Sequence, residues 1–287
     1  MESLTTYVTT GPVVAALGLC ALTINLKHDV PGASYHSAWF AEAAGTLVMI
    51  ACTFSPGKWI GADSWAVAWL AHWAGVVFAD WLCGGPHVNP GVSAAMWALG
   101  KIPYTQYLVH VSAQLAGGIV GFPLLQWYAA AAGMPALGGP EFDPAGAVPA
   151  STAALHEFLA MFLLCTLVYA VNWVFSVKDK YFVKQSLTAF GVRAIIETLG
   201  AAGPAINPGL ATTWAFYKAS LPTIVGTGKK ATEVAGQYAF PANAEFYYVY
   251  WLASTAGALA SALAYAAYSG GTFFGYRIGA APKAKKA

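Results

Sequence analysis

Residues 85–92 read GPHVNPGV, and residues 203–210 read GPAINPGL. Both stretches carry Asn-Pro-Gly within apolar sequence. Asn is a favoured N-cap, because its side-chain oxygen accepts a hydrogen bond from an N–H two or three residues later. Pro suits the first helical position, where its missing N–H costs nothing. We therefore predict that one helix begins at Asn89 and another at Asn207.

The composition places these two helix starts in a membrane. The chain is 58% hydrophobic and 9% charged, whereas a soluble domain is about a quarter charged. Apolar runs near the roughly 20 residues that cross a bilayer lie at about 8–26, 36–55, 65–83, 105–131, 151–175, 185–202 and 246–268. Their apolar residues do not alternate, which disfavours a barrel. The expected fold class is an all-α membrane protein.

A helix N-terminus carries partial positive charge and unpaired N–H donors. At membrane depth such an end is tolerated only when it is buried in protein or lines a watery cavity. Two such ends imply a pore or a binding site.

The chain also reads as two halves. Glu42 lies within a span ahead of Asn89, and Glu157 lies within a span ahead of Asn207. Each half has three spans and one re-entrant half-helix, and an odd number of spans reverses the second copy, as in an inverted repeat. We expect six transmembrane helices and two half-helices. We expect an N-terminal hydrophobic extension at residues 1–35 and a first repeat at 36–131. We expect a connecting loop at 132–150, a second repeat at 151–270 and a basic tail at 271–287. Whether 8–26 spans the bilayer or lies against the bundle stays open.

Lysines gather in the loop at 176–184 and at the C-terminus, and Lys101 follows the first Asn-Pro-Gly box. The loop at 132–150 holds acidic residues without Lys or Arg. The positive-inside rule then predicts that the C-terminus is cytosolic. We interpret the basic tail as a determinant of topology and expect no nucleic-acid partner.

Several chemistries have no support in the sequence. No CxxC pair, Ser/His/Asp set or phosphate-binding loop is visible, and His72, His110 and His156 have no ligand-like spacing with one another. Those histidines are expected to be packed residues. The chain is predicted to have no catalytic residues, no cofactor and no metal site, and therefore not to be an enzyme.

Four features together resemble the aquaporin (major intrinsic protein) family. They are the two boxes, the Gly-x-His-x-Asn-Pro context at 85–90, the Glu42-x-x-Gly-Thr phrase and AQLAG at 113–117. The resemblance covers roughly residues 36–270 and implies the aquaporin fold, a homotetramer in a lipid bilayer and small uncharged solutes. Both boxes depart from the usual Asn-Pro-Ala by carrying Gly91 and Gly209, which is a sterically mild change. The pore boxes are thus Asn89, Pro90, Gly91 and Asn207, Pro208, Gly209.

A larger departure follows the second box, where Leu210 stands in place of the Arg found in most members. Together with VYWLA at 249–253 and the apolar N-terminal stretch, this is similar to the divergent unorthodox (super-) aquaporins. That subgroup resemblance favours an intracellular or endomembrane location over the plasma membrane.

Counting from the two Asn residues without gaps, the family's selectivity-filter positions fall on Trp69, Ile195, Pro204 and Leu210. This apolar set implies either a wider aperture for glycerol-like solutes or a constriction that dewets and barely conducts. Trp69 is shared with glycerol-type filters and favours the wider aperture. The alternative is that Trp69 and Ile195 face lipid or the protein core.

The resemblance also implies roles for five polar residues. Asn89 and Asn207 would each cap a half-helix and turn an NH2 toward a passing solute. Glu42 and Glu157 would accept from backbone N–H groups of the half-helix loops, and a proton relay is the alternative. His87 is either a support at the pore edge or a packed residue.

Arg193 and Glu197 are spaced i, i+4 in one span and are expected to pair. A rival interpretation is that one of them supplies the polar group missing at Leu210.

The sequence thus favours a passive channel for water and/or small neutral solutes, such as glycerol-like molecules and hydrogen peroxide. The alternative is a non-conducting structural or accessory membrane subunit that keeps the fold. A proton-coupled transporter using the two buried carboxylates is a third, less supported hypothesis.

Overall fold

The computed structural model describes residues 35–54, 64–134, 138–142, 146–177, 179–200, 204–225 and 232–279. The predicted N-terminal segment 8–26 and the tail lysines beyond 279 lie outside these residues. The helices in chain order are α2 (Tyr35–Thr53), α4 (Trp65–Cys83), α5 (Pro90–Ala98), α6 (Tyr104–Ala131), α7 (Ala150–Tyr169) with the π-helical turn η1 (Ala170–Val174), α8 (Tyr181–Thr198), α9 (Pro208–Lys218), α10 (Ala244–Tyr247), the π-helical turn η4 (Tyr248–Ala253) and α11 (Ser254–Ser269).

Within the described residues, four helical stretches are long and apolar enough to cross a membrane. They are Trp65–Cys83, Tyr104–Ala131, Ala150–Val174 and Ala244–Ser269. The helices α2 and α8 occupy the other two predicted spans of the family-like region. The described part of the chain is thus mostly helical, with helices of membrane-spanning length, as the apolar runs predict.

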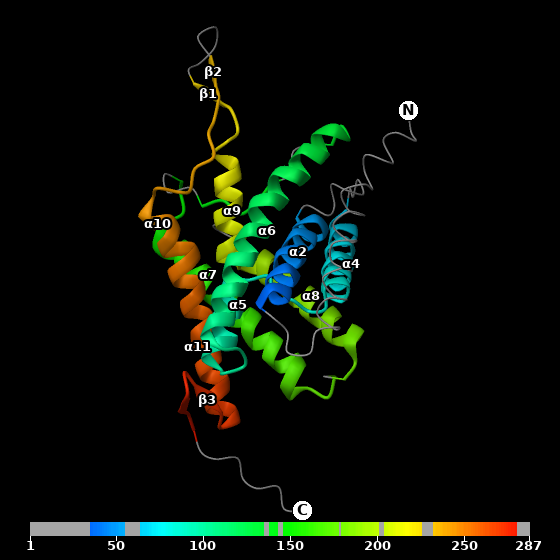
Figure 1. The fold of residues 1–287 in the computed structure, drawn as a ribbon, viewed down its shortest axis with the longest axis vertical. Coiled ribbons are helices and arrows are strands. Elements are labelled where there is room, and N and C mark those ends of the chain that lie inside the picture. The colour runs from blue at the N-terminus through cyan, green and yellow to red at the C-terminus, as the bar shows by residue number, and fades with distance from the viewer. Residues whose placement is uncertain are drawn as a thin grey trace, which may run out of the picture.

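Two short antiparallel hairpins depart from the all-α expectation. One pairs β1 (Thr223–Val225) with β2 (Thr232–Val234), and the other pairs β3 (Thr272–Phe273) with β4 (Tyr276–Arg277). Figure 1 shows the first hairpin at one end of the helical bundle and β3 at the other. The second hairpin contacts the C-terminal end of α5, where the N–H of Phe274 donates to the carbonyl oxygen of Ala98 at 2.6 Å.

The two halves of the chain pack in the same way. α2 lies along α6 in the first half, and α7 lies along α11 in the second (Figure 1). A Cβ on Gly117 would collide with the carbonyl oxygen of Ala43, and a Cβ on Gly257 would collide with that of Phe158. Small residues permit such close approach of membrane helices, and these two glycines do so at equivalent contacts in the two halves.

The half-helices join the two halves. α5 belongs to the first half but packs against α11, and α9 belongs to the second half but packs against α6. Both begin as predicted: Asn89 Oδ1 accepts from the N–H of Gly91 at 2.9 Å, and Asn207 Oδ1 accepts from the N–H of Leu210 at 3.1 Å. Because each half-helix packs against a helix of the other half, the N-termini of α5 and α9 lie next to each other.

Candidate functional site

The two capping asparagines bond across to each other's loop. Asn89 Nδ2 donates to the carbonyl oxygen of Ile206 at 2.6 Å, and Asn207 Nδ2 donates to the carbonyl oxygen of Val88 at 2.7 Å. Both asparagines are buried. The contact is reciprocal, so the position of each half-helix start depends on the loop that leads into the other.

The residues that provide these carbonyl groups have an unusual backbone. Val88 has φ +49° and Ile206 has φ +47°, in the left-handed region that β-branched residues rarely adopt. Such conformations cost about 1–3 kcal/mol and persist only where the surroundings hold them. Each strained residue turns its carbonyl oxygen toward the opposite asparagine, so the strain serves the cross-loop contact.

Glu42 holds the first strained turn from α2. Its Oε1 accepts from the N–H of His87 at 2.7 Å, and its Oε2 accepts from the N–H of Val88 at 2.8 Å. Gln114 Nε2 of α6 also donates to Oε2 at 2.8 Å. A buried carboxylate is costly in a membrane unless it is paired in this way.

Glu157 holds the second turn from α7 in the same manner. Its Oε1 accepts from the N–H of Ala205 at 2.6 Å, and its Oε2 accepts from the N–H of Ile206 at 3.1 Å and from the hydroxyl of Ser254 at 2.8 Å. The two carboxylates therefore have matching contacts, and neither turn depends on its own sequence alone.

The packing around the two boxes explains why they carry Gly where Ala is usual. A Cβ on Gly91 would overlap the terminal methyl group of Met161, a fully buried side chain of α7. A Cβ on Gly209 would lie 3.1 Å from the Pro90 ring. In the first box, the space that an Ala methyl group would fill is thus taken by a methionine from the other half of the chain.

The predicted filter residues lie in three different surroundings. Trp69 is half-buried and donates its indole N–H to Glu197 Oε1 at 2.8 Å. Ile195 is buried in a cluster that includes Met161, whereas Leu210 is buried in a different cluster with Phe122 of α6. The structure does not bring these three side chains into one cluster, and the filter assignment stays a prediction.

Pro204 and the charged pair complete the residues predicted around the filter. Pro204 is partly buried and directly precedes Ala205 in the second turn. Arg193 and Glu197 form an ion pair at 2.8 Å, as their spacing predicts. Glu197 accepts from the indole N–H of Trp65 as well as from that of Trp69, so this pair lies directly beside a predicted filter residue.

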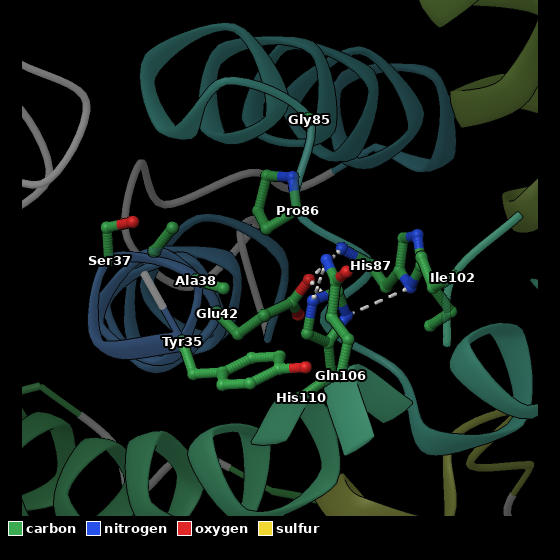
Figure 2. Close-up of a pocket in the computed structure, with 11 residues that line it drawn as sticks. Tyr35, Ser37, Ala38, Glu42, Gly85, Pro86, His87, Ile102, Gln106 and His110 are labelled. Carbon is green, nitrogen blue, oxygen red and sulfur yellow. Dashed lines mark hydrogen bonds and ion pairs between the residues drawn. The ribbon is translucent and has the colours of Figure 1, made fainter. Parts of the chain in front are cut away.

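Sequence reasoning missed one cluster beside the first turn. His110 Nδ1 of α6 lies 3.2 Å from Glu42 Oε1 and 3.2 Å from His87 Nδ1 (Figure 2). The three side chains line a cavity of about 200 Å³ between α2, the loop and α6. Glu42, His87 and His110 lie far apart in the sequence without ligand-like spacing, so no signal in the sequence could have indicated that the fold brings them together. By contrast, His156 Nδ1 lies 3.2 Å from the carbonyl oxygen of Leu199, and His72 is buried on α4.

Comparison with known proteins agrees with this geometry. A family model described as "Major intrinsic protein" matches residues 32–265. The chain is 28% identical over 98 residues to "Aquaporin-2" of Rhizopus delemar, covering 31% of each chain. It is 28% identical over 97 residues to "Glycerol uptake facilitator protein" of Bacillus subtilis, covering 30% of this chain and 35% of that one. The chain thus spans about a third of the length of these curated relatives. Since the family model covers most of the chain, including both half-helices, the chain belongs to the major intrinsic protein (aquaporin) family.

Proposed function

We propose that the protein is a passive channel for water and small neutral solutes, with one pore through each chain. Family membership makes it a multi-pass integral membrane channel and confirms that it is not an enzyme. The observation that carries the proposal is the pair of asparagine amides at the meeting point of the two half-helices.

These amides have the chemistry that a neutral-solute pore needs. An amide NH2 carries two N–H donors, and each cross-loop bond uses one of them. The second donor of Asn207 can serve a passing water or hydroxyl oxygen. Asn89 Nδ2 also contacts Met161 Sδ at 3.8 Å, and a passing oxygen, as the stronger acceptor, would take the place of that sulfur. Both half-helix N-termini are positive at this point, so cations and protonated water meet an electrostatic barrier.

The proposed architecture is six transmembrane helices and two half-helices in an inverted repeat, formed by residues 36–131 and 151–270. The matched pairing of α2 with α6 and of α7 with α11 supports it. So do the matched contacts of Glu42 and Glu157, because an inverted repeat places equivalent side chains at equivalent turns. In this arrangement α2 and α8 supply the two remaining spans.

For the filter, we propose that Trp69 narrows the pore with the Arg193–Glu197 pair beside it. The carboxylate of Glu197 fixes the Trp69 indole, and the guanidinium of Arg193 supplies the polar group that Leu210 lacks. An aromatic wall with one polar side suits glycerol-like solutes and hydrogen peroxide as well as water. The names of the two relatives, an aquaporin and a glycerol uptake facilitator, fit the same range of solutes.

Assembly and location remain parts of the same proposal. The family resemblance supports a homotetramer in the bilayer, and the lysine distribution supports a cytosolic C-terminus. Leu210 and the 249–253 stretch support the unorthodox subgroup and an intracellular membrane.

The test is stopped-flow light scattering of proteoliposomes under water, glycerol and hydrogen peroxide gradients. The wild type should exceed empty vesicles. Asn207→Asp should lower the flux, because it removes the donor to Val88 and places a negative charge at the meeting point. Asn243→Asp is the matched control, since Asn243 is an exposed residue whose Oδ1 likewise caps a helix, accepting from the N–H of Glu245. Flux equal to that of empty vesicles would favour the non-conducting structural subunit instead.

A further inference from the structure

The cluster beside the first turn contains three side chains that bind metal ions in other proteins. Glu42 comes from α2, His87 from the loop and His110 from α6. One ligand atom of each lies within 4.8 Å of the other two. Figure 2 shows the three side chains pointing toward one another at the wall of the cavity.

Two of the separations fit a tetrahedral ion. His110 Nδ1 lies 3.2 Å from His87 Nδ1 and 3.2 Å from Glu42 Oε1. Zinc binds imidazole nitrogen at about 2.0–2.1 Å and carboxylate oxygen at about 2.0–2.2 Å, which in a tetrahedron separates the ligand atoms by about 3.3 Å. Two histidines and a glutamate are also an established zinc ligand set with a fourth position left open. We propose that Glu42, His87 and His110 form a binding site for a divalent zinc ion.

The neighbouring side chains orient these ligands. His110 Nε2 lies 3.2 Å from Gln106 Nε2, and His87 Nδ1 lies 3.0 Å from the hydroxyl of Ser93. Metal-binding histidines use their second ring nitrogen in contacts such as that of His110 with Gln106, which fixes the tautomer and the ring. The Ser93 hydroxyl instead lies at Nδ1 of His87, the nitrogen that faces His110, and would give up this contact when the ion binds. Without an ion, His110 Nδ1 carries the proton and donates to Glu42. With an ion, the proton moves to Nε2 and the Gln106 amide turns its oxygen toward it.

The site has room for an ion and a structural consequence. The cavity of about 200 Å³ that the three side chains line, together with Tyr35 and Gln106, offers room for the ion. A bound ion would tie α2, α6 and the loop together next to Val88, whose carbonyl oxygen accepts from Asn207. Occupancy of the site therefore acts on the turn that positions the first half-helix. This goes beyond solute passage, and it can be tested without measuring flux.

The experiment is a zinc titration of the purified full-length protein in detergent, in competition with a chromophoric chelator. The wild type should bind one equivalent of Zn²⁺, and Co²⁺ at the same site should give the intense visible absorption of a tetrahedral complex. His110→Gln and His87→Ala should each weaken binding at least tenfold, because each removes one of three ligands. Both variants leave Glu42 and its bonds to the backbone N–H groups in place.

His156→Gln and His36→Gln are the controls, since His156 is bonded elsewhere and His36 is exposed. Each should still bind one equivalent. Melting temperatures in chelator show that the variants are folded. The proposal is overturned if the wild type binds no stoichiometric zinc, or if binding survives both His87→Ala and His110→Gln.

Discussion

Replacing Glu157 by Gln tests whether a buried carboxylate holds the second half-helix turn. Glu157 Oε1 accepts from the N–H of Ala205, and Oε2 accepts from the N–H of Ile206 and the hydroxyl of Ser254. Gln has nearly the same shape but only one acceptor oxygen. Whichever way its amide is turned, the NH2 group faces a backbone N–H, and one buried donor loses its acceptor.

The size of the effect follows from that loss. A hydrogen bond to a charged group contributes about 1.5–3 kcal/mol, and a buried donor left unpaired costs about 1–3 kcal/mol. The hydroxyl of Ser254 can rotate and accept from the new NH2, which recovers part of the cost. We therefore expect Glu157→Gln to lower the free energy of unfolding by about 2–4 kcal/mol. Ile206, at φ +47°, would then relax and move the carbonyl group that orients Asn89.

The free energy of unfolding can be measured by titrating the detergent-solubilised protein with sodium dodecyl sulfate, and water flux by stopped flow. Both should fall in Glu157→Gln. Ser254→Ala is the matched control, because it removes the third contact and keeps both bonds to the backbone, so a loss of about 1 kcal/mol or less is expected. If Glu157→Gln is as stable as Ser254→Ala and conducts like the wild type, the carboxylate does not hold the turn.

Two further predictions concern the pore wall. Trp69→Ala should raise the ratio of glycerol to water permeability, because it widens the filter. Trp81→Ala, which changes an exposed Trp of the same helix, should leave this ratio unchanged. If the two variants have the same ratio, Trp69 is not part of the filter. Gly91→Ala should lower the free energy of unfolding by about 1–3 kcal/mol through overlap with Met161, less about 1 kcal/mol regained from helix propensity. The double variant with Met161→Ala should then show a coupling of about 0.5–2 kcal/mol in stability, and additive effects would contradict the contact.

Much of the fold follows from local sequence rules. Asn followed by Pro specifies where α5 and α9 begin, because a cap and a preset φ need only adjacent residues. The span boundaries follow from apolar length: the predicted run at 65–83 is α4 without change. The duplicated pattern also pointed to Glu42 and Glu157. Each carboxylate lies in the first span of its half, and one further span separates it from the turn.

Contacts between side chains distant in the sequence could not be predicted in this way. Nothing in the sequence places His110 beside His87, because that contact depends on how α6 crosses the loop. The overlap of Gly91 with Met161 depends likewise on packing between the two halves. The bond from Trp69 to Glu197 depends on the rotation of α4 against α8, which an ungapped count of positions does not contain.

The comparison of the two turns indicates where this chain differs from a symmetric channel. Each carboxylate fixes a strained residue, and the carbonyl oxygen of that residue orients an asparagine. This function is the same in both halves and requires no additional residue. Around Glu157 the remaining contact is a single hydroxyl. Around Glu42 the remaining contacts are the side-chain amide of Gln114 and the ring of His110, which in turn contacts the ring of His87. Since the second turn is held without any histidine, an added task such as ion binding is to be sought beside Glu42. Both half-helix starts should respond to it, because Val88 in the first turn accepts from Asn207.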